Sequence, residues 1–284
     1  MDTSKEQKVE ISKAGKGKVN HVEICNVRVS SVNLKLACQV VDHWVQSRDK
    51  TYVCVAPAST IVDCCLDRKY LDIVNQAGMV TPDGMPVVWL GRLKGERQIQ
   101  RTYGPDLMMA LCREGELKGY RHYFYGGTSE VCQLLVEQLK AKFPSLDIVG
   151  TFSPSFRSIG AEEPAEIIEK INQANPDILW VGLGSPKQDF WMAQCRGRLN
   201  VPVMIGVGAA FDFLSGFKQQ APRWMQKSGL EWLFRLWSEP RRLWKRYLIG
   251  NMQFIYFVTK DFFQRKQCPR RIIKAGRQSD ETIQ

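Results

Sequence analysis

The feature that most constrains the fold of this chain is a regular alternation of apolar runs and amphipathic segments between residues 120 and 207. Short apolar runs predict buried strands, and apolar positions at helical spacing predict the helices between them. Strands that alternate with helices of this length form parallel βαβ units with right-handed crossovers. We therefore predict an α/β fold with a Rossmann-like parallel sheet and helices on both faces. The expected strands are 122–125, 146–151, 177–181 and 201–207, and the expected helices are 131–143, 164–174 and 188–197.

The first hundred residues carry shorter patterns. Alternating apolar residues within 21–32 predict a strand or hairpin, and residues 34–46 have helical spacing. A buried strand is expected at 52–56. Pro57 ends it, and Ser59 or Thr60 is expected to cap the next helix.

Three glycine turns follow apolar strands, and each precedes a segment that can be helical. They are Phe124-Tyr-Gly-Gly-Thr-Ser-Glu130, Val181-Gly-Leu-Gly-Ser-Pro-Lys-Gln188 and Ile205-Gly-Val-Gly-Ala-Ala-Phe-Asp212. A glycine turn at a helix start can bind a phosphate, because the backbone approaches closely and the helix amides favour negative charge. Each turn alone could equally serve a tight strand-to-helix connection. Three turns at strand ends favour one ligand crevice, since ligands of parallel sheets bind at the carboxyl ends of the strands.

Asp83 stands between Pro82 and Gly84, at the end of another short apolar run. Pro-Asp-Gly is a common turn sequence, and the pattern alone favours a turn-forming role for Asp83. The competing interpretation is a carboxylate that faces the crevice and acts as a base. Arg101 could bind phosphate, although exposed arginines usually contact only water.

The cysteines and histidines point away from disulfides and metal. The nine cysteines contain no CxxC pair, and the N-terminal residues form no hydrophobic leader. We therefore expect reduced, buried thiols in a cytosolic protein. His21, His43 and His122 lack metal-ligand spacing, so a histidine-based metal site is not expected.

The positive charge is concentrated in the C-terminal fifth. Residues 223–277 hold fourteen Lys and Arg against three Asp and Glu, which accounts for the whole net charge of +11. Eleven aromatic residues lie within 224–263. Basic residues interleaved with aromatics suit either an anionic membrane surface or a nucleic acid. The stretch 248–263 is too short and too polar to span a bilayer, which needs about 20 apolar residues, and an interfacial helix fits better.

These patterns divide the chain into four parts. We predict a disordered tail at 1–20, an α/β core at 21–228, a basic helical appendage that associates with membrane at 229–265, and a second disordered tail at 266–284.

A set of short motifs, in order along the chain, resembles the WecG/TagA/CpsF family of bacterial glycosyltransferases over residues 22–250. The motifs are Pro82-Asp-Gly-Met-Pro-Val-Val-Trp89, Arg101-Thr-Tyr-Gly-Pro-Asp106, Tyr125-Gly-Gly127, Gly182-Leu-Gly-Ser-Pro-Lys-Gln188, Gly206-Val-Gly-Ala-Ala-Phe-Asp-Phe213 and Ala221-Pro-Arg-Trp224, followed by the basic run from Arg235 to Arg246.

The resemblance implies an inverting glycosyltransferase that needs no metal or other cofactor. Such an enzyme moves a hexose from a UDP-sugar to a polyprenyl-diphosphate-linked saccharide. The hexose that the resemblance favours is N-acetylmannosamine. The products would feed teichoic acid, capsule or exopolysaccharide. The implied location is cytoplasmic, peripheral on the inner face of the bacterial membrane, and a homo-oligomer is possible.

The resemblance also implies roles for residues of this chain. Asp83 would be the catalytic base. Binding of the sugar nucleotide would involve Arg101, Tyr125, Gly126, Gly127, Gly184, Gln188 and Asp212. The lipid diphosphate and the membrane would be met by Arg235, Arg242, Lys245 and Arg246. Cationic side chains can stabilise the leaving UDP without a metal, which agrees with the lack of an Asp-x-Asp pair.

One motif departs from the family, and alternative functions stay open. Family members commonly carry a polar turn after the first core strand, where this chain has Ala56-Pro57-Ala58. The exact sugar is therefore open, and a UDP-glucose-using exopolysaccharide glucosyltransferase of the same family is the alternative. A non-catalytic nucleotide- or nucleic-acid-binding protein ranks far lower, because no RNA-binding or helix-turn-helix signature occurs. A dinucleotide oxidoreductase is not expected, because it would need a GxGxxG turn after the first strand and this chain has none there.

Overall fold

The computed structural model describes residues 19–154 and 162–267, and its centre is a six-stranded parallel sheet with the order β4-β3-β8-β7-β5-β6. The strands are β3 (Thr51–Ala56), β4 (Met79–Pro82), β5 (Arg121–Gly126), β6 (Asp147–Phe152), β7 (Ile178–Gly182) and β8 (Val203–Gly206). The prediction of a parallel α/β sheet is confirmed. The predicted tails fall almost wholly outside the described residues.

The register of the strands places their carboxyl ends side by side. Ala56 at the end of β3 pairs with Pro82 of β4. Gly206 of β8 pairs with Cys54 on one side and Val181 on the other. The turns that leave β3, β4, β7 and β8 therefore start from one edge of the sheet.

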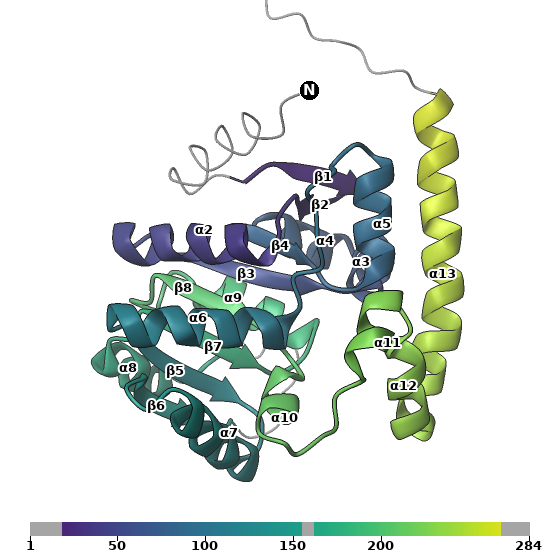
Figure 1. Ribbon diagram of the computed structural model, residues 1–284. Coiled ribbons are helices and arrows are strands. Elements are labelled where there is room, and N and C mark those ends of the chain that lie inside the picture. Colours follow the sequence, from purple (N-terminus) through teal and green to yellow (C-terminus); the bar gives the residue numbers. More distant parts are fainter. Residues whose placement is uncertain (1–18, 155–161, 268–284) are drawn as a thin grey trace, which may run out of the picture.

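Helices cover both faces of the sheet. Side chains at alternate strand positions point to opposite faces, and buried apolar side chains on each face pack against helices. Val53, Phe124 and Trp180 pack into one cluster with α2, α6, α7 and α10, whereas Cys54, Tyr125 and Val181 pack into another with α8 and α9. The helices are α2 (Leu34–Ser47), α6 (Gly104–Lys118), α7 (Ser129–Lys142), α8 (Ala165–Ala174), α9 (Lys187–Cys195) and α10 (Ala210–Leu214). Figure 1 shows this layered arrangement.

A smaller layer lies beside the sheet and contains an N-terminal hairpin, as the alternation in 21–32 predicted. Its elements are β1 (His21–Ile24), β2 (Val27–Ser30), α3 (Ala58–Leu66), α4 (Arg68–Asn75) and α5 (Met85–Leu93). The predicted cap of α3 is wrong. The helix starts at Ala58, with Pro57 in the capping position, so Ser59 and Thr60 already lie within it.

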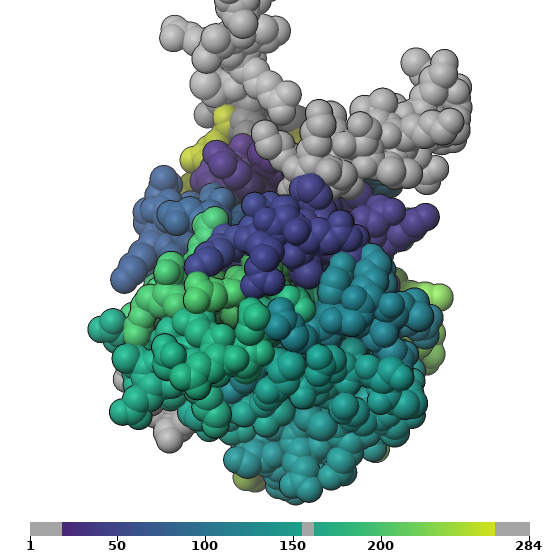
Figure 2. Space-filling model, turned by 90° about the vertical axis from the view of Figure 1, so that its left-hand side faces the viewer, coloured from purple at the N-terminus to yellow at the C-terminus, as the bar shows by residue number. Residues whose placement is uncertain are grey.

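Three helices form the C-terminal segment: α11 (Arg223–Ser228), α12 (Glu231–Ser238) and α13 (Pro240–Gln267). We expected an interfacial helix at 248–263, and this stretch is part of one helix of 28 residues that starts at Pro240. The helix α13 stands at the right-hand side of the molecule in Figure 1. Figure 2 shows the opposite side, so little of α13 is visible there.

Two apolar stripes run along α13. Phe254, Phe257 and Val258 pack into the cluster around α3, and Lys94 of the segment after α5 pairs with Asp261 at 3.0 Å. The other stripe is exposed, and its members are Leu248, Ile249, Met252, Ile255, Tyr256, Phe262 and Phe263. Within residues 19–154 and 162–267, no helix is both long and apolar enough to cross a membrane.

The packing of α6 against β5 gives the first prediction. A Cβ at Gly115 of α6 would lie 2.2 Å from Nε2 of His122, a fully buried side chain whose Nδ1 accepts a hydrogen bond from Trp180. Overpacking of this kind costs about 1–3 kcal/mol. We expect Gly115→Ala to lower the free energy of unfolding by that amount in urea melts.

Gly250 of α13 is the matched control, because it is also helical and an added Cβ there would meet no atom within 4 Å. Alanine is the better helix former by roughly 1 kcal/mol. Gly250→Ala should therefore leave stability unchanged or raise it. Equal effects of the two substitutions would contradict the packing described for Gly115.

Candidate active site

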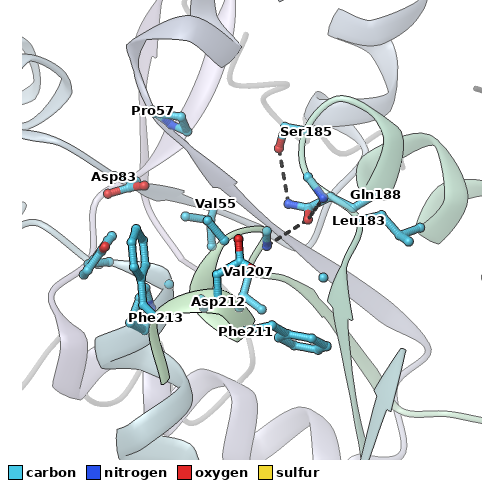
Figure 3. A pocket seen from close by; sticks show the side chains of 18 of the residues that line it. Val55, Pro57, Asp83, Leu183, Ser185, Gln188, Val207, Phe211, Asp212 and Phe213 are labelled. Carbon is cyan, nitrogen blue, oxygen red and sulfur yellow. Dashed lines mark hydrogen bonds between the residues drawn. The ribbon is translucent and has the colours of Figure 1, made fainter. Parts of the chain in front are cut away.

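A cavity of about 270 Å³ lies where the turns after β3, β4, β7 and β8 meet. Its wall includes seven of the residues predicted for the site, namely Asp83, Gly184, Gln188, Asp212, Arg235, Arg242 and Arg246. Asp83 and Gln188 stand on opposite sides of this cavity in Figure 3, with Asp212 between them. The three glycine turns thus do serve one region, although only two of them line the cavity.

Asp83 follows β4 directly, and its backbone N–H donates to the carbonyl of Ala56 at 3.2 Å. Gly84 has φ of +102°, a conformation that residues with a side chain rarely adopt, so the chain can turn sharply into α5. The Pro-Asp-Gly turn is therefore real, and it also directs the carboxylate into the cavity. Burial raises the pKa of Asp83 to about 6, while Arg101 opposes and Glu231 supports that shift.

Arg101 lies beside Asp83, and little of its side chain is exposed to solvent. Its Nη2 is 3.4 Å from Oδ1 of Asp83, and the same nitrogen donates to Oε2 of Glu231. The guanidinium also lies over the ring of Tyr103, 4.0 Å from its centroid. Arg101 is therefore a largely enclosed partner of two carboxylates.

A second cavity of about 120 Å³ adjoins the first, between the starts of α3 and α5 and the helices α12 and α13. Both cavities share Pro57, Asp83, Arg235 and Arg246. The wall of the second cavity also contains Met85, Trp232, Tyr247 and Arg101. Asp83 thus lies where the two cavities meet.

Gln188 connects two of the glycine turns. Its Oε1 accepts from the backbone N–H of Gly184 at 3.1 Å and of Gly208 at 2.9 Å, and its Nε2 donates to Oγ of Ser185 at 3.2 Å (Figure 3). The side chain is buried. A buried amide that satisfies two turn amides fixes both turns against each other.

The third glycine turn, which follows β5, packs against the end of β7 and does not line the cavity. A Cβ at Gly126 would lie 2.6 Å from the carbonyl carbon of Gly182, and the N–H of Gly127 donates to the carbonyl of Gly182 at 3.2 Å. The Tyr125 side chain points into the core, where it stacks on Trp191 and donates to Glu163. The structure therefore does not bring Tyr125, Gly126 or Gly127 to the cavity wall.

The cavity wall is rich in cations. Arg235 on α12 and Arg242 and Arg246 on α13 line it, together with Lys218. Lys218 pairs with Asp212 at 2.9 Å, and Arg246 donates to Oγ of Ser59 at 3.0 Å. Lys245 does not line either cavity. Its Nζ lies 5.5 Å from the ring centroid of Trp244.

Several residues of this site were not singled out in the sequence, and four of them are polar or charged partners of its predicted residues. They are Tyr103, Lys218, Gln226 and Glu231. Tyr103 belongs to the motif that begins at Arg101, which is the one signal that could have found it. Lys218 lies in a loop, and Gln226 and Glu231 belong to short helices whose place over the sheet depends on packing between distant segments.

A parallel sheet with a carboxylate and several cations at its carboxyl edge has the place and the charges of a binding site for an anionic ligand such as a phosphate ester. The model of the glycosyl transferase WecG/TagA/CpsF family matches residues 22–268, so the chain belongs to this family of glycosyltransferases. Three curated relatives share the name N-acetylglucosaminyldiphosphoundecaprenol N-acetyl-beta-D-mannosaminyltransferase.

The relatives come from two genera. The protein of Bacillus subtilis strain 168 is 33% identical over 182 residues, which covers 64% of this chain and 69% of the relative. The Bacillus spizizenii protein is 32% identical over 180 residues, covering 63% and 68%. The protein of Staphylococcus aureus strain MW2 is 26% identical over 219 residues, covering 76% and 82%.

Proposed function

We propose that this glycosyltransferase moves an N-acetylmannosaminyl group from a UDP-sugar to a saccharide linked to undecaprenyl diphosphate. The names of the relatives support this acceptor and this sugar. The product would enter synthesis of a cell-surface polysaccharide. The observation that carries the proposal is the position of Asp83 in the wall common to two adjoining cavities.

The two cavities suit the two substrates. The larger one has the glycine turns and Lys218, Arg235 and Arg242 in its wall, so it suits a sugar diphosphate nucleotide. The smaller one has Met85 and Trp232 in its wall and suits the acceptor sugar, which can pack against apolar and aromatic side chains. Asp83 then lies in the wall beside the point where the acceptor hydroxyl meets the donor sugar.

The chemistry requires one base. The Asp83 carboxylate takes the proton of the acceptor hydroxyl as its oxygen attacks the anomeric carbon from the face opposite the phosphate. The new carbon–oxygen bond forms while the bond from the anomeric carbon to the phosphate oxygen breaks. UDP leaves with the electron pair, and the configuration at the anomeric carbon is inverted.

The leaving UDP gains negative charge, and cationic side chains of the wall can offset it. Arg235, Arg242 and Arg246 lie on the C-terminal helices and Lys218 on the loop before them. Charge-assisted hydrogen bonds to phosphate are about twice as strong as neutral ones. We propose that these groups take the part that a divalent cation has in other nucleotide-sugar enzymes.

Turnover should therefore persist in excess EDTA. The measurement is release of UDP from UDP-N-acetylmannosamine in the presence of a short-chain prenyl-diphosphate acceptor, before and after chelation. Loss of activity that added Mg²⁺ or Mn²⁺ restores would contradict the cationic role of the side chains.

Asp83→Asn should lower kcat by about 10²–10⁴-fold, because a neutral amide cannot accept the proton. Binding of the UDP-sugar, measured by calorimetry, should be retained.

In the wild-type enzyme, protonation of Asp83 removes the base. Its pKa is raised to about 6, so kcat/KM should be level at neutral pH and fall as the pH drops below about 6.

Asp72→Asn is a suitable control, since Asp72 is an exposed partner of Arg68 on α4, away from both cavities. It should keep wild-type kcat and the same acid limb. Full activity of Asp83→Asn would contradict the role of Asp83 as the base.

A panel of UDP-sugars with the same acceptor tests the identity of the donor sugar. A preference for UDP-glucose would favour the glucosyltransferase alternative.

We further propose that the exposed stripe of α13 contacts the cytoplasmic face of a membrane. The stripe contains Leu248, Met252 and Ile255, and each of these side chains is at least 60% exposed. Trp237 on α12 is 88% exposed. Apolar and aromatic side chains beside Arg241 and Lys245 have the composition of a helix that lies in the interface of an anionic bilayer.

Met252→Asp should weaken binding to vesicles of phosphatidylglycerol by about tenfold or more, because burial of one methionine contributes about 1.5–3 kcal/mol. Leu117→Asp is the control, since Leu117 on α6 is 81% exposed and lies outside the C-terminal segment. Cosedimentation measures both. Equal binding of the two variants would contradict a membrane contact through α13.

A further inference from the structure

We infer that Glu231 is a positioning residue for the reaction: by holding Arg101 from the side of α12, it keeps that guanidinium from neutralising Asp83. This inference rests on the proposed role of Asp83 as the base. Neither the motifs of the sequence nor the names of the relatives assign a role to Glu231.

The geometry places one cation between two carboxylates. Nη2 of Arg101 donates to Oε2 of Glu231 and also to Oδ1 of Asp83, where the distance is 3.4 Å. The contact with Glu231 is the closer of the two. The side chains of Arg101, Asp83 and Glu231 are only 13%, 19% and 15% exposed, so solvent screens their charges weakly.

A neighbouring amide fixes the orientation of Arg101. Nη1 of Arg101 donates to Oε1 of Gln226 on α11 at 3.3 Å. Gln226 is buried, and its Nε2 donates to the carbonyl of Ala221 at 2.7 Å. Thus Arg101 is held by α11 and α12 on one side, and Asp83 receives the weaker remaining contact.

The charge balance follows from this arrangement. Arg101, Arg235 and Arg246 are cations near Asp83, and the carboxylate of Glu231 offsets part of their charge, which raises the pKa of Asp83 and makes its carboxylate a stronger base. Without the carboxylate of Glu231, Arg101 would pair with Asp83 alone and weaken the base. The charged and titratable groups that face Asp83 are Arg101 and Tyr103 after α5, Glu231 and Arg235 on α12, and Arg246 and Tyr247 on α13.

The arrangement also connects the base to the C-terminal segment. Glu231 and Gln226 belong to helices that the chain forms more than one hundred residues after Asp83. Only when α11 and α12 are packed in this position does Arg101 have Gln226 and Glu231 as acceptors. Docking of α11 and α12 therefore sets the basicity of Asp83 as well as closing the cavities.

The test is the titration of Asp83 in the full chain and in Glu231→Gln. Carboxyl carbon resonances of ¹³C-aspartate-labelled protein report it, and Asp83→Asn identifies the resonance. We expect the pKa of Asp83 to fall by about one unit in Glu231→Gln. The acid limb of kcat/KM should move to lower pH by the same amount, and kcat at alkaline pH should fall by about threefold to tenfold.

Two further variants separate this effect from loss of docking. Glu231→Asp keeps the charge and should return the acid limb towards that of the wild type. Asp106→Asn removes a salt bridge between α6 and Arg223 of α11, at 2.9 Å. It touches Arg101 only through Arg223 and their shared acceptor Gln226, keeps the contact between Arg101 and Glu231, and should leave the titration of Asp83 in place. A shift in Asp106→Asn as large as that in Glu231→Gln would overturn the inference.

An unchanged titration of Asp83 in Glu231→Gln would also overturn it. The resonance measurement needs no substrate, so its outcome is independent of the proposed reaction. A shifted titration in a protein that turns over no UDP-sugar would refute the proposed function but leave the control of Asp83 by Glu231 intact.

Discussion

The register of β3 against its neighbours β4 and β8 is the constraint on which the site depends. Because Ala56 pairs with Pro82 and Cys54 pairs with Gly206, the turns after these strands leave the sheet at one level. Asp83 and the turn of Gly208 are separated by more than one hundred residues in the chain, yet they face one cavity. A slip of one residue would turn the side chains of β3 to the opposite face and separate these groups.

The parallel sheet and the glycine turns could be predicted because both are local signals. The alternation after residue 120 has the right period in each segment, and the turns of Gly184 and Gly208 begin where β7 and β8 end. The direction of a side chain was harder to predict. Tyr125 is part of a glycine motif, but alternation along β5 turns it into the core behind the cavity.

The contribution of the C-terminal helices could be predicted only in part. Their basic residues indicated an anionic partner, and Arg235, Arg242 and Arg246 do line the cavity. Neither composition nor spacing indicated which acidic side chains would accompany them. Glu231 is found from its contact with Arg101, and Glu239 from its contacts with Lys218 and Arg242. Such pairs depend on the docking of α12 and α13, which no local pattern encodes.

The single helix α13 has a mechanical consequence. Its first turns carry Arg242 and Arg246 into the wall of the larger cavity, while its middle exposes Leu248 and Met252 on the outside. The region between them holds no proline that would break the helix, so both groups move as one rod. A force on the outer stripe is therefore transmitted along the helix to the arginines of the cavity wall.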